Sequence, residues 1–225
     1  MKNESGNAFW FILLAIALLT ALTVVISRSS ETTEQSGDIE RQRIVGSDVM
    51  RYAAGIEQAV GQMRLRGASE NEISFENSFV SGYTNTRCGN NDCKVFDVQG
   101  GAITFSSAAS SVSSNSWIFT GANSVSGVGE DGTGETSSAD NELLIILPGI
   151  SQELCGRINI ELGIAGIPQD TTNADVATKY VGTFPDGRVI ENMNRAKSGC
   201  FEGNLDDSGT DISGTYYFYH TLIER

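Results

Sequence analysis

The sequence has little proline or histidine and no excess of positive charge. Of its 225 residues, 3 are proline and 1 is histidine, whereas 25 are glycine. Lysine and arginine together number 15 against 28 aspartate and glutamate residues, which gives a formal net charge of −13. An acidic surface repels phosphate backbones, so we expect no nucleic-acid partner. The glycine content and the short apolar stretches beyond Arg28 are typical of a turn-rich domain that contains strands, not of a helical bundle.

Motifs that carry chemistry are also scarce. There is no Gly-x-Ser-x-Gly turn, and no glycine loop of the phosphate-binding kind precedes a helix. The one histidine, His220, lies in an aromatic stretch that reads as a strand, where a lone histidine is usually structural. We therefore expect no enzymatic activity and no cofactor apart from a candidate calcium ion. An anchored hydrolase is the least favoured class.

Cysteine is present in an even number, at Cys88, Cys93, Cys155 and Cys200. Short Cys-x-x-Cys knuckles are missing, which disfavours zinc and favours two disulfides formed in an oxidising compartment. Four cysteines allow three pairings. We favour Cys88–Cys93, because the polar residues between them form turns readily, together with Cys155–Cys200 across a long loop.

The stretch 8–26 carries no charge, and its polar interruptions are Thr20 and Thr23. A helix of about 20 apolar residues crosses a bilayer core of about 30 Å. We therefore predict a transmembrane helix over 8–26, preceded by a cytoplasmic leader over 1–7. The alternative is a cleaved signal peptide, but the run is longer than usual and no small-x-small site follows it cleanly.

A second helical pattern follows the apolar stretch. Apolar residues three or four positions apart predict one face of an amphipathic helix within 27–67, ended by Gly67. The chain therefore contains either one long helix from about Ala8 to Arg66 or two helices with a break near Gly37. The residues that define the apolar face are Val45, Val49, Tyr52, Ile56, Val60 and Met63.

The remainder, 68–225, reads as one disulfide-bearing globular domain. Alternating apolar stretches predict strands over 94–99, 102–105, 116–120 and 215–223, with a hairpin turn over 99–102. The stretch 142–147 fits either a buried strand or the start of a helix. A helix is predicted over 151–162, with Ser151 as N-cap and Gly163 at its end. The expected fold class is α+β, with a long N-terminal helix packed on an antiparallel β-sheet that carries long loops.

Two acidic loops, 130–135 and 206–211, are candidates for calcium binding. Calcium takes six to eight oxygen ligands from carboxylates and carbonyls on flexible loops. The second loop offers the carboxylates of Asp206, Asp207 and Asp211 together with a serine and a turn glycine. A solvated acidic turn is the alternative interpretation.

The order of these parts resembles a type IV pilin or a type II secretion pseudopilin. A short polar leader ends in Gly6, an apolar and then an amphipathic helix follow, and a disulfide-bearing sheet comes last. The resemblance implies that a prepilin peptidase cuts the Gly6–Asn7 bond. It also implies a single-pass protein of the bacterial inner membrane, with a cytoplasmic N-terminus and a periplasmic or extracellular domain. Pilin-like subunits, of one kind or several, would then assemble through the N-terminal helix.

The sequence departs from that family at two positions. The family has Phe or Met after the cleaved bond and Glu five residues into the mature chain, where this chain has Asn7 and Phe11. The missing Glu would neutralise a neighbouring amine inside an apolar fibre core. Its absence leaves three possibilities: a minor subunit, a chain that stays uncleaved, or a membrane-anchored protein of similar layout. The leading expectation is a pilin-like or minor pseudopilin-like structural subunit of an envelope fibre or secretion apparatus. A membrane-tethered extracytoplasmic binding domain without fibre assembly is the alternative.

Overall fold

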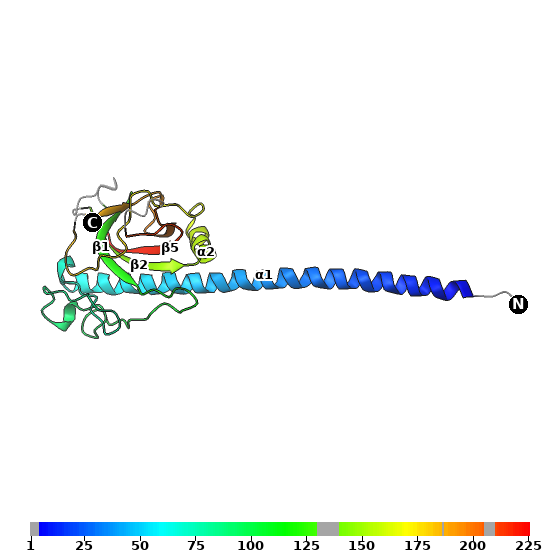
Figure 1. Ribbon diagram of the computed structural model, residues 1–225. Coiled ribbons are helices and arrows are strands. Elements are labelled where there is room, and N and C mark those ends of the chain that lie inside the picture. Colours follow the sequence, from blue (N-terminus) through cyan, green and yellow to red (C-terminus); the bar gives the residue numbers. More distant parts are fainter. Residues whose placement is uncertain (1–4, 130–139, 186, 205–209) are drawn as a thin grey trace. The chain divides into compact units, whose positions relative to one another are not determined.

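In the computed structural model, the described residues form two α-helices, two short 3-10 helices and five strands (Figure 1). It describes residues 5–129, 140–185, 187–204 and 210–225, and for residues 5–8 and 25–38 it describes the backbone alone. The chain divides into two compact units, Met1–Gln42 and Arg43–Arg225. The elements in order are α1 (Ser5–Leu65), η1 (Glu70–Glu72), η2 (Asn91–Cys93), β1 (Ile118–Val125), β2 (Glu142–Ile150), α2 (Gln152–Leu162), β3 (Arg188–Ile190), β4 (Ser198–Glu202) and β5 (Tyr216–Ile223).

Of the two alternatives for the N-terminal region, the structure has the single long helix, since α1 continues through Gly37. The predicted apolar face of its C-terminal part is confirmed. Ile56, Val60 and Met63 are almost fully buried, and they belong to the core that α1 shares with the sheet. Gly67 ends the helical turn with a φ of +100°, a backbone conformation that glycine adopts without strain.

The predicted transmembrane helix over 8–26 is not confirmed. Within the side chains that the structure describes, which cover Phe9–Val24 of that stretch, no helix is both long and apolar enough to cross a membrane.

The sheet is mixed, so the prediction of a wholly antiparallel sheet is wrong. Its strand order is β3-β1-β2-β5-β4. The pairs β1–β2, β2–β5 and β4–β5 are antiparallel, but β3 lies parallel to β1, with Asn123 opposite Arg188. The chain reaches β3 through the long segment between α2 and Arg188, which lets it enter the edge of the sheet in the same direction as β1.

Both faces of the sheet are covered, which explains why 142–147 was ambiguous in sequence. Leu143, Ile145 and Leu147 of β2 face the core shared with α1. Leu144 and Ile146 face a second core, formed with loop residues such as Met193. A strand that is buried on both sides loses the alternation of apolar and polar residues, and only its partners show that it is a strand.

Two predicted strands are absent. Residues 94–99 form a single bridge at Lys94 followed by turns, and residues 102–105 belong to no strand. The turn over 99–102 exists, but it joins no hairpin. Apart from η1 and η2, the region between Gly67 and β1 is irregular chain gathered around the C-terminal end of α1 (Figure 1). The prediction over 116–120 overlaps β1, and that over 215–223 matches β5 closely.

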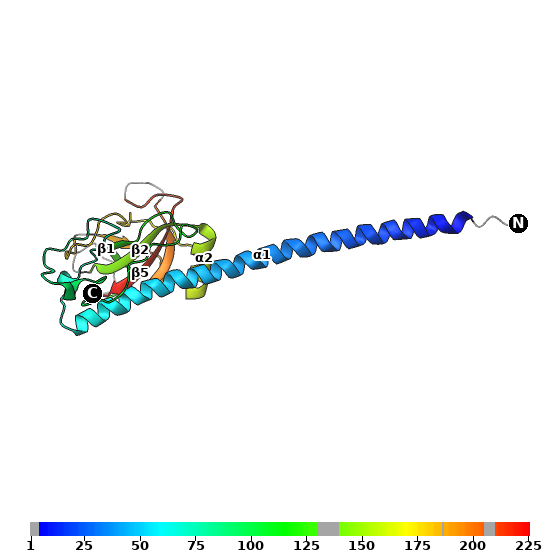
Figure 2. The same cartoon turned by 90° about the horizontal axis from the view of Figure 1, so that it is seen from below.

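The helix α2 begins and ends where the sequence predicted. The Ser151 hydroxyl accepts a hydrogen bond from the Leu154 N–H at 3.2 Å, and Gly163 has a φ of +75° at the C-terminus. Such an N-cap contributes about 1 kcal/mol. α2 packs against β4 and β5 (Figure 2), and its inward face is held there by the disulfide from Cys155 to Cys200.

Candidate functional site

The most unusual surface of the protein is the apolar segment of α1, residues Phe9–Val24. Its large apolar side chains are exposed on every side of the helix, with exposed fractions between 48% at Leu13 and 66% at Phe9. A helix that is apolar all round is normally buried in a core or in lipid. The exposed side chains are Phe9, Trp10, Phe11, Ile12, Leu13, Leu14, Ile16, Leu18, Leu19, Leu22 and Val24.

The two threonines of this segment do not interrupt its apolar character. The Thr20 hydroxyl donates to the Ile16 carbonyl at 3.0 Å, and the Thr23 hydroxyl donates to the Leu19 carbonyl at 2.8 Å. Both hydroxyls are therefore satisfied within the helix and need no water. Transfer of the segment from water into an apolar environment would be favourable by about 25 cal/mol for each Å² of apolar surface removed from water. It would leave neither hydroxyl unpaired.

The two residues of the predicted processing site, Gly6 and Asn7, lie at the start of α1, which begins at Ser5. Cleavage of the bond between them stays a prediction. It would leave the apolar segment at the very N-terminus of the mature chain.

Both predicted disulfides are confirmed. Cys88–Cys93 and Cys155–Cys200 have Cα–Cα distances of 5.6 Å and 5.4 Å, which are ordinary for disulfides. The first closes the polar loop at η2. The second is fully buried and joins α2 to β4 across a sequence separation of 45 residues. Both belong to the unit Arg43–Arg225, where they restrict the unfolded chain.

Two carboxylates meet beside the predicted calcium loop. Asp170 and Asp211 are each 1% exposed. The Asp211 Oδ2 atom accepts the Asn204 N–H at 2.7 Å, whereas its Oδ1 atom accepts no hydrogen bond from the residues that the structure describes. Burial, followed by the negative charge of Asp170, raises the pKa of Asp211 to about 6. In the folded chain the Asp211 carboxyl therefore holds a proton more readily than a free aspartate does.

Of the three predicted calcium ligands, Asp211 belongs to the described residues, and calcium binding stays a prediction. Asp206 and Asp207 lie outside the described residues, as does the loop 130–135. In the described part of the chain, no group of three or more His, Cys, Asp or Glu side chains could hold a metal ion. Asp170 and Asp211 supply two carboxylates of the six to eight oxygens that calcium takes, and Asp170 was not foreseen from the sequence.

His220 lies in a polar cluster that joins three elements. Its Nε2 atom is 2.9 Å from Oε2 of Glu57 on α1, and its Nδ1 atom accepts from the hydroxyl of Ser198 on β4. Burial lowers the pKa of the imidazole, although the Glu57 carboxylate opposes that effect. The ring is therefore neutral at pH 7, with its Nε2–H donated to Glu57.

A carboxylate, an imidazole and a hydroxyl in series are also the groups of a serine nucleophile. Here Ser198 and His220 are direct cross-strand neighbours in the β4–β5 ladder. The Thr221 N–H donates to the Lys197 carbonyl at 2.8 Å, so this main-chain donor beside the pair is already used in a hydrogen bond between the two chain segments. The cluster fastens α1 to the edge of the sheet, which agrees with a structural role for the histidine.

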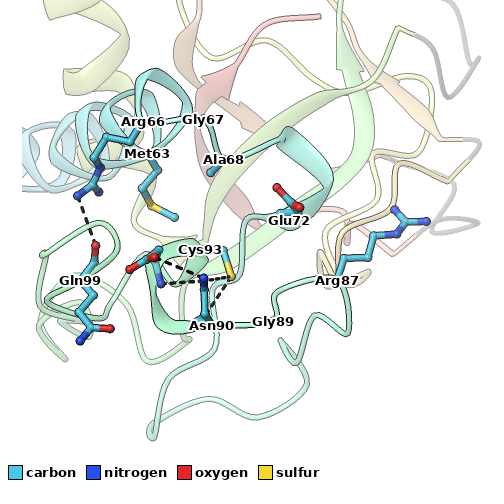
Figure 3. Close-up of a pocket in the computed structure, with 11 residues that line it drawn as sticks. Met63, Arg66, Gly67, Ala68, Glu72, Arg87, Gly89, Asn90, Cys93 and Gln99 are labelled. Carbon is cyan, nitrogen blue, oxygen red and sulfur yellow. Dashed lines mark hydrogen bonds between the residues drawn. The ribbon is translucent and has the colours of Figure 1, made fainter.

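A polar pocket of 560 Å³ lies beside the Cys88–Cys93 loop (Figure 3). Arg66 lines it and donates to the carbonyls of Gln99, at 3.3 Å, and of Gly100. Arg87 lines it too, but in Figure 3 its guanidinium points away from Arg66, and it donates to the Gly182 carbonyl. Both arginines donate to main-chain carbonyls of irregular chain and so stabilise its fold. This structural role accounts for the presence of the arginines in the pocket.

In comparisons with known proteins, no family model, curated protein or solved structure matches the chain. The surface that stands out physically is thus the apolar segment of α1. The sequence located it directly, because its composition alone marks it. Glu57, Ser198 and Asp170 had no such signal, since each acquires its role from a residue far away in the chain.

Proposed function

We propose that this protein is a pilin-like or minor pseudopilin-like structural subunit of an envelope fibre or secretion apparatus. The observation that carries the proposal is the exposed apolar segment Phe9–Val24, whose two hydroxyl groups are satisfied inside the helix. Such a surface is stable in lipid or against other apolar helices, and unstable in water. Its work would be assembly, through that segment.

The same helix supports the proposal at its other end. From Val49 to Met63, α1 buries an apolar face against a disulfide-bonded α+β unit. A subunit of this kind needs one part of the helix for contacts between chains and another for its own core. The resemblance in the order of the parts, from Gly6 to the disulfide-bearing sheet, agrees with this division.

The proposal also includes a cellular location, which is argued from the same features. The apolar stretch 8–26 would hold the chain in the bacterial inner membrane, with residues 1–7 in the cytoplasm. Disulfides persist in oxidising compartments, so the unit that contains Cys155–Cys200 would face the periplasm or the exterior. A prepilin peptidase would remove residues 1–6.

Two measurements on the protein from native membranes test the proposal. Intact-mass analysis is expected to show that the mature chain begins at Asn7. A photo-cross-linking residue in place of Leu18, which is 63% exposed, is expected to give a ladder of cross-linked subunits. The matched control replaces Ile160, which is 65% exposed on α2, and is expected to give no ladder.

A full-length, monomeric chain in these membranes would contradict fibre assembly. That outcome would favour the second candidate, a membrane-tethered extracytoplasmic binding domain. A specific observation supports a binding role as well, namely an apolar pocket beside Tyr52 and Trp117.

A further inference from the structure

From Ile103 to Ser106, one segment of the described chain alternates inward and exposed side chains as a strand does, but it has no partner strand. Residues 102–109 belong to no regular element. Ile103 and Phe105 turn inward and pack in the core, whereas Ala102, Thr104 and Ser106, which alternate with them, are exposed. Alternation of this kind is the pattern of an extended chain with one buried face. Residues 103–109 are called the unpaired segment below. They follow Ala102, whose φ of +54° lies outside the extended region.

Its main-chain donors are largely unused. Among the described residues, the N–H groups from Ile103 to Ala109 find a protein acceptor at one place, where the Ser106 N–H donates to the Tyr52 hydroxyl at 3.0 Å. Exposed main-chain groups in an extended segment offer a template to which another strand can be added. The unpaired segment is therefore suited to accept a further strand.

An apolar pocket of 280 Å³ lies beside the unpaired segment. Val45, Val49 and Tyr52 of α1 form one wall, and residues 106–112 form much of the other. A volume of this size admits one or two aliphatic side chains but not a folded domain. The complete lining consists of Val45, Asp48, Val49, Tyr52, Ser106, Ser107, Ala108, Ala109, Ser111, Val112 and Trp117.

Trp117 lines the pocket and carries a polar group that has no hydrogen-bond partner among the described residues. The residue is 2% exposed, and its ring lies 5.3 Å from that of Tyr52. Its indole Nε1–H has no acceptor within the described chain. A buried donor without a partner costs about 1–3 kcal/mol, so a ligand that brings a carbonyl oxygen to this position would regain part of that free energy.

We propose that the unpaired segment and this pocket together bind an extended peptide segment of a partner protein. The partner's main chain pairs with residues 103–109, one aliphatic side chain enters the pocket, and a peptide carbonyl accepts the Trp117 indole N–H. Asp48 is the charged residue in the lining, and the whole chain carries a net charge of −13, which favours a neutral or basic partner segment. The inference goes beyond assembly through α1, because it assigns a separate recognition surface to the unit Arg43–Arg225.

The test uses the full-length protein in detergent micelles with the substitution Trp10→Phe, which leaves Trp117 as the one tryptophan of the chain. Its indole proton is followed by NMR during titration with capped hexapeptides acetyl-Thr-Xaa-Thr-Xaa-Thr-Lys-amide, where Xaa is Leu, Ile, Val, Met or Phe. At least one peptide is expected to shift the indole proton downfield and to saturate below about 1 mM, a free energy of about −4 kcal/mol. The same peptide with alternate main-chain nitrogens methylated is expected to bind at least tenfold more weakly.

Two variants locate the site. Ala109→Phe fills the pocket from its lining and is expected to weaken binding at least tenfold. Ser110→Phe adds the same ring at an exposed neighbour outside the lining, and is expected to leave binding unchanged.

The proposal is overturned if none of the five peptides shifts the indole proton. It is equally overturned if the methylated peptide binds as tightly as its parent, because the pocket would then take apolar molecules without strand pairing. An indole shift that grows with protein concentration in the absence of peptide would assign the surface to a second copy of the chain, and would overturn it too.

Discussion

The two ends of α1 have the same backbone and opposite surroundings. Between Phe9 and Val24 the apolar side chains are exposed, whereas Ile56 and Val60 are fully buried. Both stretches are helical, so apolar content by itself does not decide what a helix packs against. The C-terminal part has one apolar face and finds a core within its own chain. The N-terminal part is apolar all round, which one sheet cannot cover.

The largest effect that we predict concerns the Cys155–Cys200 disulfide, which lies in the unit Arg43–Arg225 and has no counterpart in the apolar part of α1. Replacement of both Cys155 and Cys200 by Ala is expected to lower the free energy of unfolding of this unit by about 4 kcal/mol, from the closure of a 45-residue loop. Denaturant unfolding followed by near-UV circular dichroism measures the loss. Removal of the Cys88–Cys93 bridge, whose sequence separation is 5, is the control and should cost about 2 kcal/mol. Equal losses from the two bridges would contradict the loop-entropy account.

Truncation of one aliphatic side chain in each part of α1 sharpens the comparison directly. Ile56→Ala is expected to destabilise the globular unit by about 3 kcal/mol, because the side chain is fully buried and leaves a cavity. Leu18→Ala removes a similar side chain that is 63% exposed, and is expected to change the same unfolding transition by less than about 0.5 kcal/mol. A comparable loss from Leu18→Ala would show that the apolar segment contributes to the core after all.

The buried acid pair predicts a pH dependence that belongs to the globular unit alone. The pKa of Asp211 is about 6 in the folded state against an ordinary value of 3.8, so the folded state holds this proton more tightly than the unfolded state. The resulting stability is fully present below pH 3.8 and is lost as the pH rises through 6. Asp211→Asn is expected to remove this limb, which is on the order of 2 kcal/mol.

Denaturant unfolding between pH 3.5 and 7.5 on the two proteins measures this effect as a difference. The control is Asp48→Asn, since Asp48 is an exposed carboxylate on α1 paired with Arg51. A stability difference between Asp211→Asn and the parent that stays constant across the range would refute the assignment.

The smallest effect is expected at the contact between α1 and the sheet edge. Burial lowers the pKa of His220 and Glu57 raises it, so Glu57→Gln should lower this pKa further. NMR titration of the imidazole tests this without ambiguity, because the chain contains 1 histidine. A group whose folded pKa is depressed contributes stability above its unfolded value, which is lost as the pH falls through the folded pKa. The variant should therefore be more sensitive to acid, but lose less than about 1 kcal/mol at pH 7, since the Glu57 side chain is 41% exposed. An unchanged His220 pKa in Glu57→Gln would show that the Glu57 carboxylate does not interact with the imidazole.

Local signals in the sequence were sufficient for several elements. The N-cap Ser151 and the terminal Gly163 fixed both ends of α2, and the period of apolar residues gave the buried face of α1. The aromatic and β-branched run 215–223 gave β5. In each case the residues that make the decisive contacts lie within a few positions of one another.

Prediction failed where a partner decides the structure. Residues 102–105 have the alternation of a strand, yet no other strand of the described chain pairs with them. The parallel pairing of β3 with β1 follows from a long connection that composition does not encode. The same limit applied to the candidate sites, because Asp170 meets Asp211, and Glu57 meets His220, only after the sheet has formed.

The sequence by itself determined a helix with an apolar first part, an amphipathic second part and two disulfides in an acidic domain, since those features depend on periodicity, composition and short-range turn chemistry. Tertiary structure alone decided the mixed strand order, the burial of Asp211 against Asp170 and the unpaired segment beside Trp117. These depend on which distant groups exclude water together, and burial of that kind is a property of the assembled chain and not of any one stretch of it.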